Sequence, residues 1–175
     1  DPSRILDLIK QRQSELDEVE RSAQQVVPSL LNASAYLPYA NIKFYEDHDG
    51  VATILRDVLD TASKTPQKEY YAISSKPMRQ YIYKKFPNFT AKRIKQGLFV
   101  KVIALGDGGE EARASERKWL TGFSETEPSS YTLIYGDKLA IIALNHAMHP
   151  YGIVIEDSGV AGAQRLLFNQ IWNAS

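Results

Sequence analysis

Three histidines and no cysteine limit the metal and nucleophile chemistry available to this 175-residue chain. His146 and His149 have an i, i+3 spacing that suits metal ligands on a helix, but Pro150 and the strand-like flanks predict a loop there. The absence of cysteine excludes a thiolate metal site and a disulfide. No Gly-x-Ser-x-Gly nucleophile elbow is present, although the residue count alone leaves a Ser-His-Asp triad open. We therefore expect neither a metal nor a cofactor.

A glycine-rich stretch, Gly106-Asp-Gly-Gly109, invites comparison with phosphate-binding loops. It lacks the Gly-x-Gly-x-x-Gly spacing and the Gly-Lys-Ser/Thr ending of those loops. Glu110 and Glu111 follow it directly, and their carboxylates would repel an anion. The stretch is predicted to be an ordinary loop.

Basic residues gather in one part of the chain, although the 21 basic and 21 acidic residues cancel overall. Between Tyr70 and Gly106 no residue is acidic. The basic residues there are Lys76, Arg79, Lys84, Lys85, Lys92, Arg93, Lys95 and Lys101. Two readings stay open: a solvated helix face, or a positive wall for an anionic ligand or a partner. The zero net charge gives no support for nucleic-acid binding by this chain.

Hydrophobic periodicity divides the chain into alternating strands and helices. Strands are predicted at 41–45, 69–74, 98–105, 130–135, 138–144 and 151–155, and helices at 50–63, 76–96 (interrupted near residue 87), 110–120 and 158–172. Strands separated by helices favour parallel pairing, while Gly136-Asp137 predicts one antiparallel hairpin. The sequence therefore predicts an α/β fold with a mixed, largely parallel sheet flanked by helices.

The hydrophobic pattern sets the first 35 residues apart as a separate arm. Apolar residues recur with steps of four and three, the 3.5-residue period of a coiled coil, with Arg12 inside the seam. The predicted seam residues are Ile5, Ile9, Leu16, Val19, Val26 and Leu30. We predict a coiled-coil dimerisation arm at 1–35 that forms a homodimer, followed by a globular domain at 36–175. The alternative is a lone amphipathic helix that packs on its own domain.

Several segments in order resemble the C-terminal effector region of TrmB-type transcriptional regulators. They are Val27-Pro-Ser-Leu-Leu31, Phe44-Tyr-Glu-Asp-His-Asp-Gly50, Lys101-Val-Ile-Ala104, Ile134-Tyr-Gly-Asp-Lys-Leu-Ala-Ile-Ile142, Gly152-Ile-Val-Ile-Glu-Asp157, and Arg165-Leu-Leu-Phe168 with Trp172. The resemblance covers nearly the whole chain. It implies a phospholipase-D-like domain behind a coiled-coil linker, and a sugar or sugar phosphate as effector. Such regulators bind DNA through an N-terminal winged helix-turn-helix, for which this chain has no room.

The same resemblance allows a test of catalysis. Phospholipase-D enzymes use a His-x-Lys-x4-Asp motif in which the histidine is nucleophile and acid/base. If Lys138 takes the lysine place, Gly136 takes the histidine place and Ala143 the aspartate place. Neither residue can attack phosphorus or transfer a proton. We therefore expect that the chain is not an enzyme and that Lys138 serves anion binding.

A ligand pocket is expected beyond the carboxyl ends of the strands, where open α/β sheets form their sites. The first three strand ends supply Tyr45, Glu46, Ser74, Ser75 and Ala104, and the hairpin and last strand supply Tyr135, Asp137, Lys138, Glu156 and Asp157. In the alternative reading, Glu46 and Asp157 only cap helices and Tyr135 belongs to the core.

These patterns together predict a non-catalytic, effector-sensing and dimerising domain of a transcriptional regulator whose DNA-binding domain is absent from this chain. A cytoplasmic location is expected, because the polar N-terminus lacks a signal-peptide core and no apolar run is long enough to span a membrane. Two alternatives stay open: a phospholipase-D-type phosphodiesterase or nuclease, and a pure protein-interaction module. The effector's identity and the direction of regulation are not readable from the sequence.

Overall fold

The computed structural model describes residues 12–13, 18, 41–106, 112–122 and 130–174. The chain divides into two units, residues 1–39 and 40–175. In the first unit, residues 12, 13 and 18 are helical and exposed. The predicted seam residues Ile5, Ile9, Leu16, Val19, Val26 and Leu30 lie outside the described residues. The coiled coil and the homodimer therefore remain predictions.

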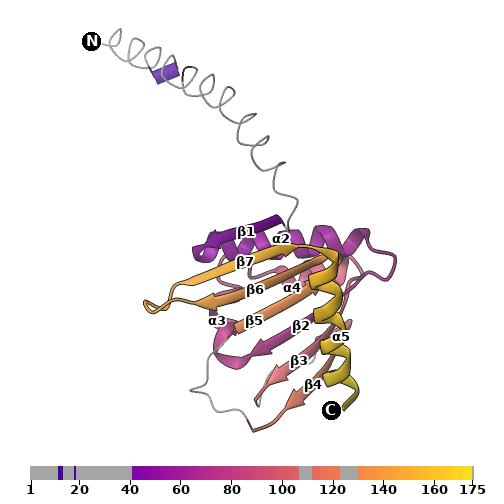
Figure 1. The fold of residues 1–175 in the computed structure, drawn as a ribbon. Coiled ribbons are helices and arrows are strands. Elements are labelled where there is room, and N and C mark those ends of the chain that lie inside the picture. The colour runs from indigo at the N-terminus through magenta and orange to yellow at the C-terminus, as the bar shows by residue number, and fades with distance from the viewer. Residues whose placement is uncertain (1–11, 14–17, 19–40, 107–111, 123–129, 175) are drawn as a thin grey trace, which may run out of the picture. The chain divides into compact units, whose positions relative to one another are not determined.

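The second unit is built from seven strands and the helices that pack on them (Figure 1). The strands are β1 (Asn41–Glu46), β2 (Glu69–Ser75), β3 (Phe99–Leu105), β4 (Ser115–Leu120), β5 (Ser130–Tyr135), β6 (Lys138–Leu144) and β7 (Pro150–Glu156). The helices are α2 (Asp47–Lys64), the 3-10 turn η1 (Lys76–Met78), α3 (Arg79–Ile82), α4 (Phe89–Lys95) and α5 (Ser158–Ala174). Among the described residues, no helix is long and apolar enough to cross a membrane.

All seven strands form one sheet in the order β1-β7-β6-β5-β2-β3-β4. Only β2 with β3 and β3 with β4 pair in parallel, and the other four pairings are antiparallel. The mixed sheet flanked by helices is as predicted, but the expectation that it is largely parallel is wrong. The reason is that β5, β6 and β7 follow one another as a meander, which requires antiparallel neighbours.

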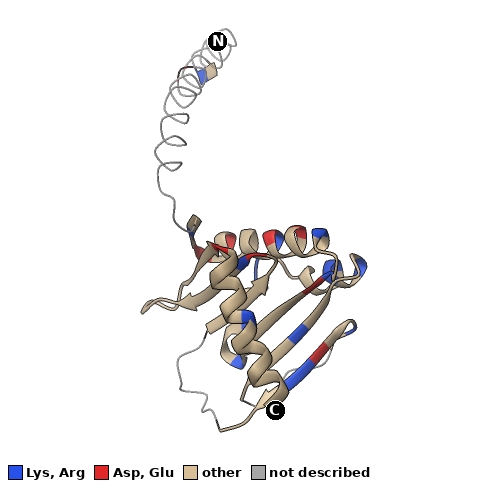
Figure 2. Cartoon of the chain, turned by 45° about the vertical axis from the view of Figure 1, so that its right-hand side comes forward, with Lys and Arg blue, Asp and Glu red and all other residues tan. Residues whose placement is uncertain are grey.

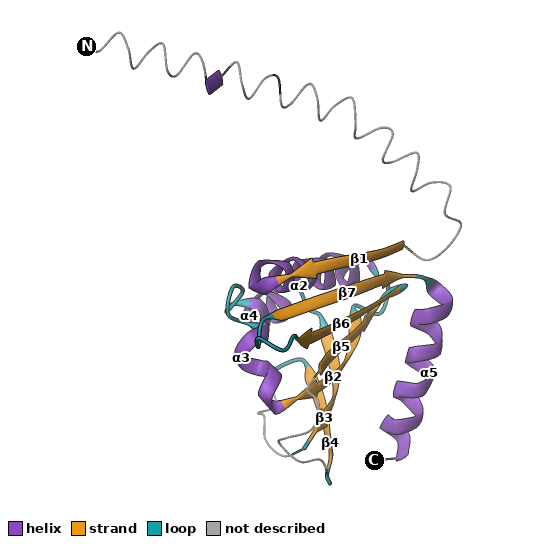
Figure 3. Cartoon of the chain, turned by 60° about the vertical axis from the view of Figure 1, so that its left-hand side comes forward, coloured by secondary structure: helices purple, strands orange, loops and turns teal. Residues whose placement is uncertain are grey.

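Helices cover both faces of the sheet, so the strands form the middle layer (Figure 3). The face under α2 contains most of the core, because α2 places apolar residues such as Val51, Ile54, Leu55 and Val58 along one stripe. The helices η1, α3 and α4 contribute Met78, Ile82 and Phe89, respectively, to the same cluster. On the opposite face α5 buries Ala161, Phe168 and Trp172 in a second, smaller cluster.

The segment at 110–120 differs from its prediction. Charged, helix-favouring residues there predict a helix, whereas residues 115–120 form strand β4 at the edge of the sheet. The strand pairs in parallel with β3 from Val100↔Ser115 to Leu105↔Leu120. The unpaired edge of β3 offers a full row of backbone hydrogen bonds, and this tertiary gain outweighs intrinsic helix propensity, which is a fraction of a kcal/mol per residue.

Candidate ligand site at one end of the sheet

The structure places the predicted site residues at two opposite ends of the sheet. Register puts Lys138 beside Tyr135 on one side and Glu156 on the other, so these three residues lie together. Ser74 pairs with Tyr131 near the start of β5, which places the carboxyl end of β2 at the other end of the sheet. A single cleft that contains all the predicted residues is therefore not formed. The antiparallel run of β5, β6 and β7 reverses the strand ends that a parallel sheet would align.

A polar network centred on Asp57 of α2 occupies the first of these ends. Lys138 Nζ donates to both Asp57 carboxylate oxygens, at 2.8 and 3.0 Å, and the Tyr135 hydroxyl donates to Oδ2 at 2.9 Å. Lys138 also lies 3.1 Å from Glu156 Oε1, which accepts a second bond from Lys43 at 2.8 Å. The network thereby fastens α2 to the β5–β6 hairpin and to β1.

The hydrogen bonds and charges of this network shift the pKa values of its members. The pKa of Glu156 is lowered, chiefly by the Lys43 hydrogen bond and also by Lys138. Partial burial lowers the pKa of Lys138, but the hydrogen bonds to Asp57 and Glu156 outweigh it and the net shift is upward. Burial, followed by the Asp57 charge, raises the pKa of Tyr135, so its hydroxyl stays protonated and donates. Lys138 thus has two carboxylates as neighbours, which leaves it poorly suited to bind an additional anion.

The turn between β5 and β6 needs a glycine at Gly136. Its φ is +53°, and a Cβ there would lie 2.9 Å from Thr61 Cγ2. The close approach of the turn to the end of α2 shapes one wall of a pocket beside the network.

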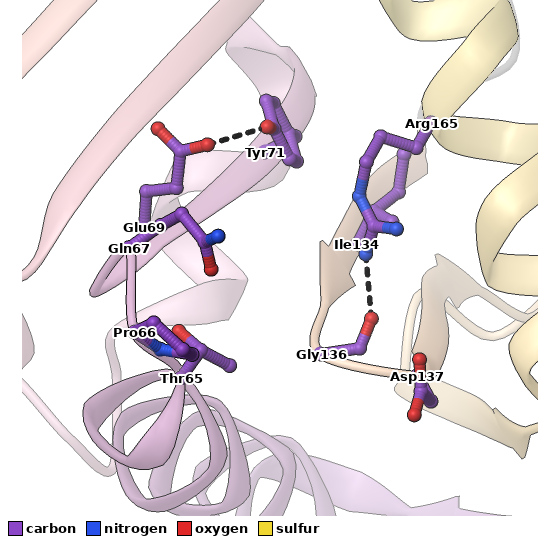
Figure 4. Close-up of a pocket in the computed structure, with 9 residues that line it drawn as sticks. All are labelled: Thr65, Pro66, Gln67, Glu69, Tyr71, Ile134, Gly136, Asp137 and Arg165. Atoms are coloured by element: carbon purple, nitrogen blue, oxygen red, sulfur yellow. Dashed lines mark hydrogen bonds between the residues drawn. The ribbon is translucent and has the colours of Figure 1, made fainter.

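This pocket, which we call the turn pocket, has a volume of about 380 Å³. It lies between the α2–β2 connection, the start of β2, the β5–β6 turn and α5 (Figure 4). The lining residues are Thr65, Pro66, Gln67, Glu69, Tyr71, Ile134, Gly136, Asp137 and Arg165. Of the predicted site residues, only Asp137 lines it. The other lining residues were not predicted, because only the tertiary fold brings the α2–β2 connection, β2, the β5–β6 turn and α5 together.

Two hydrogen bonds hold opposite walls of the turn pocket in place, both drawn in Figure 4. Arg165 Nη2 donates to the Gly136 carbonyl at 2.6 Å, and its guanidinium lies 5.8 Å from the Tyr71 ring centroid. The Tyr71 hydroxyl donates to Glu69 Oε1 at 2.6 Å. Burial and Glu69 raise the pKa of Tyr71 to about 12, so the phenol stays neutral. These contacts fix the shape of the pocket without filling it.

The remaining polar groups of the pocket are open to a ligand. The side chains of Gln67 and Asp137 make no hydrogen bond or ion pair with any residue that the structure describes. Together they offer amide donors and acceptors beside two carboxylates, those of Glu69 and Asp137, and one guanidinium, that of Arg165. The pocket therefore carries more negative than positive charge, and it can recognise a ligand rich in hydroxyl groups.

Four other predicted residues lie at helix ends or are buried. Asp157 Oδ1 accepts from the Val160 backbone N–H at 2.8 Å and caps α5, as the alternative reading expected. Glu46 is at the N-cap position of α2 but makes no side-chain cap bond. Ser74 and Ser75 are buried, and Ser75 Oγ donates to the Ser130 carbonyl at 3.3 Å.

Two further predicted residues lie toward the end of the sheet opposite the turn pocket. Tyr45 is half-buried against the core, and Ala104 is buried in β3. Glu46 lines a wider groove of about 640 Å³ with Phe44 and His149. In that groove His149 Nδ1 lies 3.5 Å from Asp47 Oδ1, and both side chains are mostly exposed.

The structure gives members of the basic stretch different surroundings. Arg93 is buried, and its guanidinium donates to the backbone carbonyls of Leu98, Arg113 and Ala114. Lys92 lies over the Phe86 ring. Within the described ranges, no group of three or more histidines and acidic residues is placed to hold a metal ion.

Comparisons with known proteins give similarity at the level of the fold. No protein-family model matches the sequence, and no curated protein matches it. TrmBL2, an archaeal chromatin protein whose structure shows a novel mode of DNA binding, is 13% identical with a TM-score of 0.49, over 97% of this chain and 66% of that chain. NucT from Helicobacter pylori is 9% identical with a TM-score of 0.47, over 77% of this chain and 96% of that one. Polyphosphate kinase from Porphyromonas gingivalis is 8% identical with a TM-score of 0.47, over 73% and 25%. Similarities with TM-scores below 0.5 assign neither a family nor an activity.

Proposed function

We propose that this chain is a non-catalytic sensing and dimerising domain of a TrmB-like transcriptional regulator. Its effector binds in the turn pocket, and DNA is bound by a helix-turn-helix domain outside this sequence. The observation that carries the proposal is a pocket whose walls are fixed by Arg165–Gly136 and Tyr71–Glu69 while Gln67 and Asp137 remain open. The sequence resemblance and the heptad pattern of the first 35 residues give the regulatory context.

The charge of the turn pocket favours an uncharged sugar over a sugar phosphate. Two carboxylates face one guanidinium, and that guanidinium is already bonded to the Gly136 carbonyl. A phosphate group would meet more repulsion than attraction there. Hydroxyl groups, which both donate and accept, match the amide and carboxylates of Gln67, Glu69 and Asp137.

A thermal-shift experiment tests the sensing function on the full chain, with a panel of neutral sugars and their phosphates. A ligand at about a hundredfold excess over its Kd stabilises by ~2.7 kcal/mol, which raises Tm by roughly 5–10 °C for a chain of this size. We expect a neutral sugar to produce this shift in the unmodified chain and in Gln96→Ala, an exposed glutamine away from the pocket. The shift should be lost in Gln67→Ala. If no ligand of the panel shifts Tm, the protein-interaction module becomes the better function.

The competing function, a phosphodiesterase, is disfavoured by three observations. With Lys138 in the lysine place of the family motif, Gly136 and Ala143 take the places of the catalytic histidine and aspartate, and Lys138 itself is engaged by Asp57 and Glu156. We expect no turnover of a generic phosphodiester. Turnover that disappears in Lys138→Ala would contradict the proposal.

A further inference from the structure

A small cavity lies between the sheet and the helices α3 and α4. Its volume is about 90 Å³, and its lining residues come from β2, β3, β4 and β5, from α3 and α4, and from neighbouring loops. Successive residues of a strand point to opposite faces of a sheet. Tyr70 lines this cavity, whereas Tyr71 lines the turn pocket. The two sites therefore lie on opposite faces of β2.

Three arginines line this cavity, which we call the arginine cavity: Arg79 of α3, Arg93 of α4 and Arg117 of β4. None of its described lining residues is acidic. The run without acidic residues between Tyr70 and Gly106 accounts for much of this, because it contains α3, α4 and β3, and these elements show no red in Figure 2. The described lining of the cavity is therefore positively charged.

The charge of Arg93 is buried without a carboxylate partner among the described residues. Arg93 is 2% exposed, and its three hydrogen bonds all go to backbone carbonyls, which are neutral. A guanidinium has five N–H donors, so these three bonds leave two donors that no described residue accepts. A buried charge is costly unless an opposite charge compensates it. An anion in the arginine cavity would supply that compensation.

Two hydroxyl groups of β2 face the cavity and bond no residue that the structure describes. They belong to Tyr70 and Ser74, whose side chains are buried, with 2% and 8% exposure. Every fully enclosed polar side-chain atom in the described ranges has a hydrogen-bond partner, so these two hydroxyls must reach the open space of the cavity. Burial raises the pKa of Tyr70, so its hydroxyl stays protonated and can donate to an anion.

Two more hydroxyl groups complete the set of donors. Tyr131 lies opposite Ser74 in the strand register, and its hydroxyl is 3.5 Å from that of Tyr83. A hydrogen bond of this length is weak, so both hydroxyls can turn toward a ligand. Burial also raises the pKa of Tyr131, which keeps its phenol protonated. The arginine cavity thus combines guanidinium groups with neutral hydroxyl donors.

We propose that the arginine cavity binds a tetrahedral oxyanion, either inorganic phosphate or the phosphoryl group of a small molecule. The arginine charges select an anion, and hydrogen bonds from the hydroxyl donors to that anion are strengthened by its charge. The volume of about 90 Å³ selects the size, because it equals roughly three water molecules at ~30 Å³ each. A phosphate group can replace these waters, whereas a whole sugar cannot. The site is independent of the turn pocket, whose carboxylates favour an uncharged ligand.

Isothermal titration calorimetry with inorganic phosphate tests the site on the full chain, in a buffer without other oxyanions. Tyr70→Phe removes one hydroxyl donor and keeps the ring, and Arg79→Gln removes one exposed charge of the lining. Each variant should weaken the Kd for phosphate at least about tenfold, because hydrogen bonds to charged groups are the stronger ones. Without phosphate, Tyr70→Phe should unfold at the same urea concentration as the unmodified chain or a higher one, because its hydroxyl bonds no described residue.

Tyr151→Phe and Lys95→Gln are the matched controls. Both residues lie outside the lining of the cavity, and Lys95 is an exposed member of the same basic stretch. Both variants should leave the Kd for phosphate unchanged. A parallel titration with glucose 6-phosphate identifies the source of the group: binding that Tyr70→Phe weakens assigns a phosphoryl group of a larger molecule, and binding of inorganic phosphate alone assigns the free ion.

Two results would overturn this inference. No binding of phosphate to the unmodified chain at millimolar concentrations would show that the cavity does not select an anion. Equal weakening by Arg79→Gln and Lys95→Gln, with no effect of Tyr70→Phe, would show diffuse attraction by the basic stretch. Neither result bears on the sensing function, which the thermal shift with neutral sugars tests separately.

Discussion

Replacement of Asp57 tests whether the polar network holds α2 on the sheet. In Asp57→Ala the buried Tyr135 hydroxyl loses its acceptor at 2.9 Å, which costs about 1–3 kcal/mol. Lys138 loses one of its two carboxylates but keeps Glu156, and a partly exposed pair of this kind contributes about 0.2–1 kcal/mol. We therefore expect a loss of about 2–3 kcal/mol in the free energy of unfolding. Asp57→Asn keeps an acceptor for Tyr135 and should cost about 1 kcal/mol.

Urea unfolding at neutral pH measures these differences, and Asp60→Ala is the matched control. Asp60 belongs to the same helix and is exposed, so its replacement should change stability by less than about 0.5 kcal/mol. A double-mutant cycle of Asp57→Asn with Tyr135→Phe should give a coupling energy of about 0.5–2 kcal/mol. If Asp57→Ala and Asp60→Ala unfold at the same urea concentration, the network does not stabilise the fold as argued.

Three other predictions concern stability. Because the pKa of Glu156 is lowered in the folded state, the stabilisation from its ion pairs is fully present above pH 4.5 and is lost as the pH falls below that value. Glu156→Gln should therefore flatten the dependence of the free energy of unfolding on pH in acid, as measured by urea unfolding. An unchanged pH dependence would contradict this. Arg93→Ala removes the donor to three backbone carbonyls and should lower the free energy of unfolding by about 3–5 kcal/mol in a denaturant titration. Arg93→Lys should restore only part of this stability, because an ammonium group lacks the planar fork of donors in a guanidinium. Full recovery of stability would show that the charge alone suffices. Gly152→Ala places a Cβ 2.3 Å from Ile54 Cδ1 and should lower the free energy of unfolding by about 1–3 kcal/mol. Adding Ile54→Val should restore part of this stability in the same titration. An unchanged stability of Gly152→Ala would show that the Ile54 side chain moves freely aside.

The secondary structure was largely readable from the sequence because it depends on local periodicity. The hairpin at Gly136-Asp137 and helix α5 both have the predicted positions. Strand direction was not readable, since the strand that pairs with β1 in the described part of the chain is β7, more than 100 residues later. Alternation along a strand shows which face is buried but does not show which strand lies beside it.

The candidate site was predicted only in part, for the same reason. The sequence analysis placed Tyr135, Lys138 and Glu156 in one site, and these residues do lie together in the structure. It did not indicate that Asp57 belongs to the same network. Asp57 is one acidic residue on the polar side of an amphipathic helix, and only the packing of α2 brings it to the hairpin. Likewise Gln67 and Arg165 become neighbours of Asp137 through the tertiary fold alone.

The pairing of β1 with β7 has a consequence for synthesis of the chain. The contact between Asn41 and Glu156 joins residues 115 positions apart. At about 5–20 residues per second, roughly 6–23 s pass between the emergence of β1 from a ribosome and the emergence of its partner strand. Throughout that interval the apolar side chains of Ile42 and Phe44 have no strand beside them. Early termination before β7 would leave this strand permanently unpaired and prone to aggregate with other nascent chains.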